Sequence, residues 1–184
     1  GGASVIAVEP IPNTFEALKR NVVLNELQDH IECLNVGLGA ESKELLFSSD
    51  HDTINHVVVE GENPTGTVTV PVARLDDVLG SAVPTLIKID VEGFETQVID
   101  GAQKTLSNPK LLAVIMELNG SGDRYGFDEN QLHKKMLDFG FSSYRYQPSK
   151  RQLITKNGRR NYVGNTLYLR SQDEVLRRIS EDNQ

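Results

Sequence analysis

The stretch LIKIDVEGFE at positions 86–95 combines an apolar pattern, typical of a buried strand, with charged residues. Lys88 and Asp90 are two residues apart, so a strand would project both from one face. A buried ammonium needs a partner, so the two are either a self-satisfied ion pair or a lysine that tunes a proton-accepting carboxylate. Glu92 precedes Gly93 and is either a second acid or base, or only a charge that favours the start of a helix. Our candidate catalytic residues are therefore Asp90, Lys88 and Glu92.

Other predicted strands also end in polar side chains. Glu9 follows the apolar run 4–8, where a carboxylate can accept hydrogen bonds from both hydroxyls of a ribose, although it can equally be an exposed turn residue. Glu117 and Asn119 mark the end of the most apolar run in the chain. Together with Asp90 they offer oxygen ligands that suit Mg²⁺, but the same set would serve hydrogen bonding to a substrate.

Apolar strands alternate with helices along the chain. Helices are predicted from the capping pattern of Asn13 and Glu16, after Gly93, and after Asp128, the last closed by Gly140. This order predicts an α/β fold with a mostly parallel sheet, helices on both faces, and ligands at the carboxyl ends of the strands. Short strands joined by polar turns predict an antiparallel edge near the C-terminus. The expected strands cover 4–8, 30–39, 43–49, 84–90, 111–118, 141–147, 151–155 and 164–170, and the stretch 67–79 is expected to hold an alternating strand followed by a helical turn.

Length, net charge and cysteine content limit the classes of protein to which this sequence can belong. The 184 residues fit one domain, and the net charge of -7 argues against nucleic acid or an anionic membrane as the main partner. The lone Cys33 permits no internal disulfide, and no apolar run is long enough to span a membrane, so we expect a cytoplasmic protein. His51 and His56, in a polar stretch, are more simply solvated than catalytic. The basic segment 150–160 is most simply a solvated hairpin, with contact to an anionic substrate as the alternative.

Four blocks along the chain have the order and spacing of one known family. The sequence resembles the FkbM-type S-adenosylmethionine-dependent methyltransferases from about Val5 to about Leu169, and KIDVEGFE followed by GA is the most specific part. The resemblance implies a Rossmann-like class I methyltransferase fold over a single domain, 1–184, with an antiparallel strand near the C-terminus. The four blocks are VIAVEPIPNTFEALKRNVVLN, VPVARLDDVL, LIKIDVEGFETQVIDGA and VIMEL.

The resemblance also implies roles at the strand ends. Glu9 would hold the ribose of the cofactor S-adenosylmethionine, and Ile11 would pack near its adenine. Asp90 would lie beside the methionine part of the cofactor and the acceptor, with Glu117 and Asn119 across the acceptor pocket. The groups implied to reach the adenine edge are those of Asn35, Val36 and Gly37.

The family's first strand and glycine-rich turn, which cradle the methionine end of the cofactor, would precede Val5. We therefore expect that about one βα unit is absent from this sequence. The strands on either side of the absent strand would then have unpaired edges.

The reaction that the resemblance implies is methyl transfer to a hydroxyl of a sugar or natural product. The partner would be a small-molecule or glycan acceptor, with no nucleic acid and no membrane. Asp90, tuned by Lys88, would accept or orient the proton of that hydroxyl. Two alternatives stay open: a binding or scaffold module that kept the fold and lost activity, and a nicotinamide-dependent dehydrogenase, whose ribose would also suit Glu9.

Overall fold

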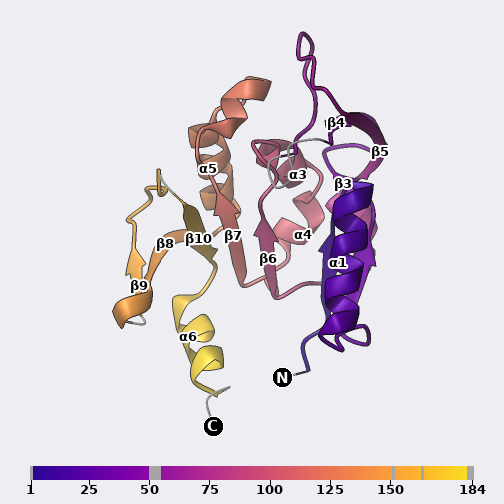
Figure 1. The fold of residues 1–184 in the computed structure, drawn as a ribbon. Helices are drawn as coiled ribbons and strands as arrows, with labels where there is room; N and C mark the ends of the chain where they lie inside the picture. The colour runs from indigo at the N-terminus through magenta and orange to yellow at the C-terminus, as the bar shows by residue number, and fades with distance from the viewer. Residues whose placement is uncertain (1, 50–54, 151, 163, 182–184) are drawn as a thin grey trace.

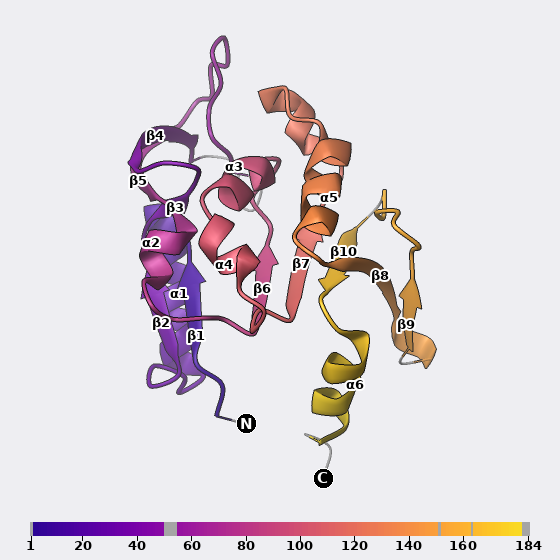
Figure 2. The same cartoon turned by 180° about the vertical axis from the view of Figure 1, so that it is seen from behind.

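The computed structural model describes residues 2–49, 55–150, 152–162 and 164–181. It has an α/β fold with helices on both faces of the strands. Helix α1 (Pro12–Leu24) lies on one face, as Figure 1 shows. The opposite face, turned forward in Figure 2, carries α2 (Leu75–Leu79), α3 (Glu95–Asp100), α4 (Gln103–Ser107) and α5 (Glu129–Asp138). Within the described residues, no helix combines the length and the apolar character needed to cross a membrane.

A five-stranded sheet forms the centre of the molecule and carries the predicted antiparallel edge. Its strand order is β6-β7-β10-β8-β9, with β6 parallel to β7 and antiparallel pairing from β7 onward. The last element, α6 (Gln172–Glu181), follows β10. The strands are β6 (Leu86–Ile89), β7 (Ala113–Glu117), β8 (Ser142–Gln147), β9 (Gln152–Thr155) and β10 (Asn165–Leu169).

The remaining described strands form two smaller sheets, so the expected single, mostly parallel sheet is not continuous. One is the parallel pair of β1 (Val5–Val8) and β2 (Ile31–Leu34). The other has the order β3-β5-β4, from Gly37–Leu38, Thr67–Ala73 and Lys43–Ser48. Among the strands that the structure describes, β1 pairs only with β2, and β6 only with β7. Each therefore has one edge without a strand partner in the described part of the chain. That a strand of the family is absent from this sequence stays a prediction.

Two predicted elements are divided in the structure. The expected strand 30–39 is two strands, β2 and β3, separated by Asn35 and Val36. The helix expected after Gly93 is two helices, α3 and α4, because the chain must pass close to a neighbouring loop at Gly101. A Cβ atom at Gly101 would lie 2.0 Å from the carbonyl oxygen of Gly39.

The predicted cap of the first helix was wrong, whereas that of α5 is confirmed. Ile11 is the N-cap of α1 and Pro12 occupies its first turn, so Asn13 lies inside the helix. In α5, Asp128 is the N-cap, and its side chain accepts a hydrogen bond from Asn130 N–H. Gly140 follows that helix with a φ of 86°, a conformation that glycine adopts readily.

The hydrophobic core has two clusters. The larger one lies between the five-stranded sheet and α3, α4 and α5, and β7 is its central strand, with Val114 and Met116 fully buried. Burial of each such side chain contributes about 1.5–3 kcal/mol to folding. The smaller cluster joins the start of α1 to the sheet β3-β5-β4; its buried members are Ile11, Phe47, Val57, Val70 and Val72.

Asp76 of α2 ties that helix to α4, and both helices contribute buried residues to the larger cluster. Its two carboxylate oxygens accept hydrogen bonds from the backbone N–H of Lys104 and from the N–H and hydroxyl of Thr105, at 2.7–2.9 Å. These groups belong to the first turn of α4, whose N–H groups have no partner within the helix. A buried carboxylate from one helix therefore caps another.

Candidate functional site

The carboxyl ends of β6 and β7 bring the central acidic residues together. Ile89 pairs with Met116, so Asp90 and Glu117 follow at the same level on neighbouring strands. Lys88 Nζ lies 2.5 Å from Asp90 Oδ2, which confirms the predicted ion pair. The predicted burial was wrong, because the two side chains are 51% and 44% exposed. An exposed lysine does not require a partner, so desolvation is not the reason for this pair.

The turn after Asp90 has an unusual backbone. Glu92 has a φ of 52° and Gly93 a φ of 99°, and for a glutamate that conformation is strained. The buried carboxylate of Glu95 holds the turn, since its Oε1 accepts hydrogen bonds from Val91 N–H and Gly93 N–H at 3.3 Å. A Cβ atom at position 93 would lie 2.4 Å from Ser121 O, so glycine is required both for φ and for packing. The turn is thus fixed on two sides.

Negative charge gathers around Glu92. Burial raises the pKa of the Glu92 carboxyl above its usual value, and the carboxylates of Asp90 and Glu117 raise it further. Arg124 and His56 act in the opposite direction on that pKa. A carboxylate with a raised pKa holds a proton more firmly, which suits a group that accepts a proton from a substrate hydroxyl.

A polar cluster from the loop that contains His56 and Glu62 and from a short 3-10 helix, Ser121–Tyr125, accompanies these carboxylates. His56 Nε2 and Arg124 Nε lie 3.3 Å and 3.7 Å from Glu62 Oε1. The Tyr125 hydroxyl donates a hydrogen bond to Val57 O at 3.0 Å and so joins the short helix to the loop. His56 is only 9% exposed, so the expectation of a solvated histidine was wrong. Its burial depends on contacts between distant loops, which single-residue patterns do not report. His51 lies outside the described residues.

The turn between β1 and α1 presents the carboxylate of Glu9. Its Oε1 accepts a hydrogen bond from Ile11 N–H at 2.8 Å, and burial raises the pKa of the carboxyl. Oε2 has no hydrogen-bond partner among the described residues. Asn35 Nδ2 donates to the carbonyl oxygens of Glu9 and Pro10 at 2.8 and 2.9 Å, which fixes the turn against the connection that follows β2. One partly desolvated oxygen is thus available to accept hydrogen bonds from a ligand.

The other predicted cofactor contacts have structural roles in the described chain. Ile11 is 4% exposed and belongs to the smaller core cluster. A Cβ atom at Gly37 would lie 3.0 Å from Val72 and 3.1 Å from Phe47, so packing alone explains the glycine. Val36 is half-buried between the two short strands. Contact of these residues with an adenine ring stays a prediction.

The magnesium alternative gains no support. Asn119 Oδ1 accepts hydrogen bonds from the backbone N–H and the hydroxyl of Ser121, at 3.0 and 2.5 Å, so its oxygen has partners within the protein. Within the described ranges, no three His, Cys, Asp or Glu side chains are placed as a group that could hold a metal ion. A metal bound by Asp90, Glu117 and Asn119 stays a prediction.

A buried ion pair that the sequence did not indicate holds the end of β7. Arg160 and Glu129 form an ion pair at 3.0 Å, with side chains 12% and 7% exposed. Arg160 also donates to Leu118 O at 3.1 Å, and Glu129 Oε1 accepts from Gly120 N–H at 2.7 Å. Arg160 ends the segment expected to be a solvated hairpin, so that prediction was wrong for this residue. Its partner is 31 positions earlier in the chain, a distance at which no local pattern is visible.

Comparison with known proteins identifies relatives of the chain. The model of a family described as Methyltransferase FkbM domain matches residues 1–147. Methyltransferase 1 of Beauveria bassiana (strain ARSEF 2860) is 31% identical over 123 residues, covering 54% of this chain and 49% of that protein. The hexuronic acid methyltransferase AglP of Haloferax volcanii is 29% identical over 126 residues, covering 66% of this chain and 49% of that protein.

A solved structure has the same fold. It is the crystal structure of the methyltransferase FkbM from Methylobacillus flagellatus KT, with a TM-score of 0.57 and 17% sequence identity. The match covers 91% of this chain and 36% of that chain. The chain spans about half the length of the two curated relatives described above.

Proposed function

Because the chain belongs to the FkbM methyltransferase family, we propose that it takes part in methyl transfer from S-adenosylmethionine to a hydroxyl oxygen of a sugar or natural product. The observation that carries the proposal is the group of carboxylates, Asp90, Glu92 and Glu117, at the carboxyl ends of two parallel strands. Ligands of parallel α/β sheets bind at such ends. Family membership also favours methyl transfer over the hydride-transfer alternative.

Glu9 fits the cofactor that the family implies. Its half-buried carboxylate has one oxygen held by Ile11 N–H and the other without a partner in the described chain. Such an oxygen can accept hydrogen bonds from ribose hydroxyls, and Asn35 keeps the turn in place. When bound, S-adenosylmethionine supplies an activated methyl group on a positively charged sulfur.

The strand-end carboxylates would act on the acceptor. The attacking hydroxyl must lose its proton as the new oxygen–carbon bond forms, and a carboxylate within hydrogen-bond distance can take that proton. Asp90 is our candidate for this role, because Lys88 fixes its orientation at 2.5 Å. Glu92 is the second candidate, and the rigid turn held by Glu95 keeps its position.

A glycan acceptor is supported by one relative, whose name describes it as a hexuronic acid methyltransferase. A sugar offers hydroxyl groups of the kind that the proposed chemistry needs. The acidic cluster itself bears a net negative charge, so it suits hydrogen bonding to neutral hydroxyls better than contact with an anionic group.

The test combines cofactor binding with methyl transfer in the protein. Calorimetric titration with S-adenosylhomocysteine should show binding, and Glu9→Gln should weaken it by roughly tenfold, because a neutral amide accepts weaker hydrogen bonds than a carboxylate. Absence of binding in the unchanged protein would contradict the proposal and favour the scaffold alternative.

Asp90→Asn separates chemistry from structure. We expect methyl transfer to a panel of sugars to fall by about 10²–10⁴-fold, with S-adenosylhomocysteine affinity and thermal stability retained. The matched control is Asp138→Asn, which removes the acid from another exposed lysine–aspartate pair, at 2.7 Å from Lys134. Equal activity in both variants would show that the Lys88–Asp90 pair is only structural.

A further inference from the structure

Cations are concentrated in one part of the chain. Between Asp138 and Asp173 the sequence has seven lysines and arginines and no acidic residue, in a protein with a net charge of -7. Two of these cations are used internally. Arg160 pairs with Glu129, and Arg170 donates hydrogen bonds to three main-chain carbonyls. Neighbouring like charges repel one another, so a bound anion would stabilise the cations that have no such role.

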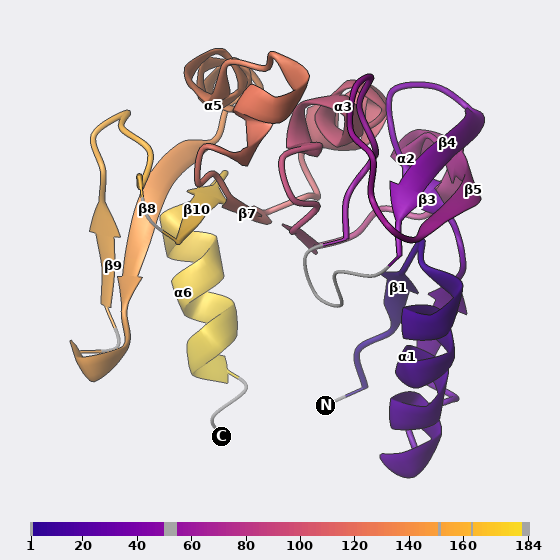
Figure 3. The same cartoon turned by 45° about the horizontal axis from the view of Figure 1, so that its top comes forward.

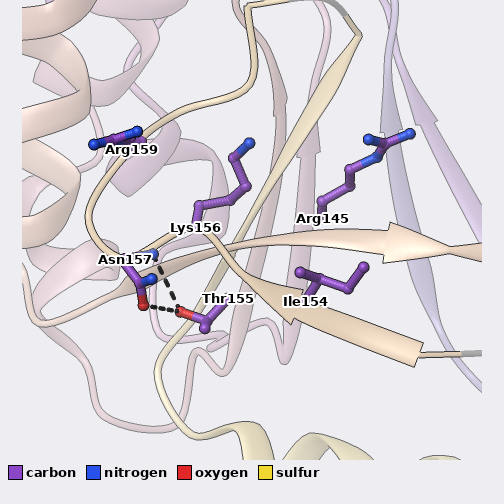
Figure 4. Close-up of a pocket in the computed structure, with 6 residues that line it drawn as sticks. All are labelled: Arg145, Ile154, Thr155, Lys156, Asn157 and Arg159. Carbon is purple, nitrogen blue, oxygen red and sulfur yellow. Dashed lines mark hydrogen bonds between the residues drawn. The ribbon is translucent and has the colours of Figure 1, made fainter.

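A pocket of about 370 Å³ lies on this segment, on the hairpin of β8 and β9 (Figure 4). Its volume is within the range of small-molecule sites, about 300–1,000 Å³. Arg145 comes from β8, and Lys156 and Arg159 from the segment after β9, with Lys156 between the two arginines in Figure 4. In the part of the chain that the structure describes, none of these cations pairs with a carboxylate. The other lining residues are Ile154, Thr155 and Asn157.

The wall of this pocket is held in place by hydrogen bonds. Lys156 N–H donates to Ser143 O at 2.9 Å, which continues the pairing of β8 and β9. Gly158 has a φ of 77°, and its carbonyl oxygen accepts a hydrogen bond from His133 Nε2 of α5 at 3.0 Å. Lys156 and Arg159 therefore project from a turn anchored to both a strand and a helix, and Arg145 projects from β8 itself, which lowers the ordering cost of binding.

We propose that this basic pocket, defined by Arg145, Lys156 and Arg159, binds the anionic group of an acidic sugar, either a carboxylate or a phosphate ester. Guanidinium groups match both anions with paired hydrogen bonds, and a lysine adds a compact positive charge. The polar side chains of Thr155 and Asn157 would hydrogen-bond to sugar hydroxyls, and the half-exposed Ile154 offers an apolar contact for the ring.

The basic pocket suits the acceptor rather than the methyl donor, an assignment that rests on the proposed function. Glu9, the candidate ribose ligand, follows β1 in a separate sheet, and Figure 3 shows β1 and the β8–β9 hairpin on opposite sides of the molecule. Arg159 is followed directly by Arg160, which donates to Leu118 O beside the end of β7. The pocket segment is thus linked to the residue that follows β7, and an acceptor that also reaches Asp90 or Glu117 would extend across β8 and β10, which lie between β9 and β7.

The experiment measures binding to the protein without any methyl donor, by chemical-shift changes in two-dimensional NMR. The probes are D-glucuronate, glucose 6-phosphate and, as a neutral control, glucose. We expect saturable binding of one or both anions, weakened by added salt, and little binding of glucose. Arg145→Gln/Arg159→Gln should weaken anion binding by roughly tenfold or more, because it removes two charge-assisted contacts.

The matched control is Arg20→Gln/Lys110→Gln, which removes the same charge from exposed positions outside the basic pocket. Equal loss of affinity in both double variants would overturn the proposal, since net charge alone would explain it. Chemical-shift changes with glucuronate only would show that the pocket binds a carboxylate, and changes with glucose 6-phosphate only would show that it binds a phosphate ester. The absence of changes with both sugars would also overturn the proposal. A single-stranded RNA that binds through these cations more tightly than both sugars would replace it with a nucleic-acid surface.

These outcomes are independent of the proposed function. Anion binding that depends on the basic pocket, in a protein that transfers no methyl group, would support the pocket and contradict the methyltransferase proposal. If the protein transfers methyl groups to a neutral sugar, Arg145→Gln/Arg159→Gln does not affect that transfer, and no anion binds, the methyltransferase proposal would be supported. The basic pocket proposal would then be contradicted.

Discussion

At the scale of single residues, Glu92 combines a strained backbone with an unfavourable charge environment. Its φ of 52° costs a non-glycine residue about 1–2 kcal/mol relative to a helical or extended conformation. Burial and the carboxylates of Asp90 and Glu117 raise its pKa, so its ionised form is disfavoured in the folded protein. Strain of this kind persists where the surrounding structure enforces it, and it is frequent at functional sites.

Glu92→Gly should therefore stabilise the fold while removing the carboxylate. We expect the free energy of unfolding to rise by about 1 kcal/mol, since glycine adopts positive φ readily but gives up part of that gain through its greater freedom when unfolded. Because the folded-state pKa of Glu92 is raised, wild-type stability falls as pH rises through it, so the advantage of the variant should grow with pH. Urea unfolding at several pH values measures both effects.

Glu26→Gly is the control for this prediction. Glu26 has a φ of 56° at the end of α1, away from the carboxylate cluster. The same relief of backbone strain is expected there, so this variant measures the conformational part of the effect alone. Loss of stability in Glu92→Gly would mean that contacts of this side chain outweigh its strain.

For single residues, the sequence predicted which side chains form an ion pair better than it predicted how exposed they are. The spacing of Lys88 and Asp90 was sufficient to predict their ion pair, because alternate residues of a strand share a face. It did not predict their exposure, which depends on what covers that face. The roles of Arg124 and Arg160 depend on contacts between loops and helices far apart in the chain, and no local pattern indicates them.

At the scale of elements, Asp76 connects helices through a pH-sensitive contact. Although burial alone would raise the pKa of its carboxyl, hydrogen bonds from Thr105 and Lys104 outweigh it and lower that pKa below the usual 3.8. Asp76→Asn replaces an acceptor with a donor that faces N–H groups, so we expect a loss of about 2–3 kcal/mol in the free energy of unfolding at neutral pH. Thermal unfolding monitored by circular dichroism provides the measurement.

The pH dependence of that loss has a definite sign. A lowered folded-state pKa gives stability above the unfolded-state pKa that disappears as pH falls, so the wild type and Asp76→Asn should converge below pH 3.8. Asp77→Asn is the control, because Asp77 is exposed in the same helical turn. A difference between wild type and Asp76→Asn that stays constant to low pH would contradict the proposed role of the charge.

The type of a helix or strand was predictable where the pattern of apolar residues was long, whereas the residues at which it begins and ends were not. The apolar run around β7 and the cap of α5 at Asp128 follow from local chemistry. The break between α3 and α4 does not, because Gly101 must approach the carbonyl of Gly39, which is more than sixty residues earlier. Helical spacing of apolar residues continues across that break and predicts a single helix.

At the scale of the whole molecule, β1 and β6 each have an edge that pairs with no other strand in the described ranges, and such an edge can pair with another chain. Among the described residues, Val5, Ile6 and Leu86 of these strands are 46%, 37% and 53% exposed. We expect the 184-residue chain to self-associate with rising concentration, and Ile6→Lys to reduce this, because a charge on an edge strand opposes strand pairing. Sedimentation velocity provides the measurement.

Leu24→Lys is the matched control for edge pairing. Leu24 is 78% exposed, more than Ile6, but lies at the end of α1 rather than on a strand edge. Reduction of self-association by both variants alike would indicate general hydrophobic attraction instead. The α/β class and the antiparallel edge were predictable from the order of elements, whereas the division into three sheets depends on which strands meet.

The modest burial of β1 and β2 bears on how Glu9 would hold a ligand. No residue of either strand is buried, in contrast to β7, so local opening of this pair should cost far less free energy than opening of the central sheet. Part of the binding free energy of a ligand held by Glu9 would then be used to close the strand pair. The apparent affinity would be lower when a smaller fraction of the molecules has the pair closed. Any contact that rigidifies β1, even one that does not touch the ligand, would raise the affinity for that ligand.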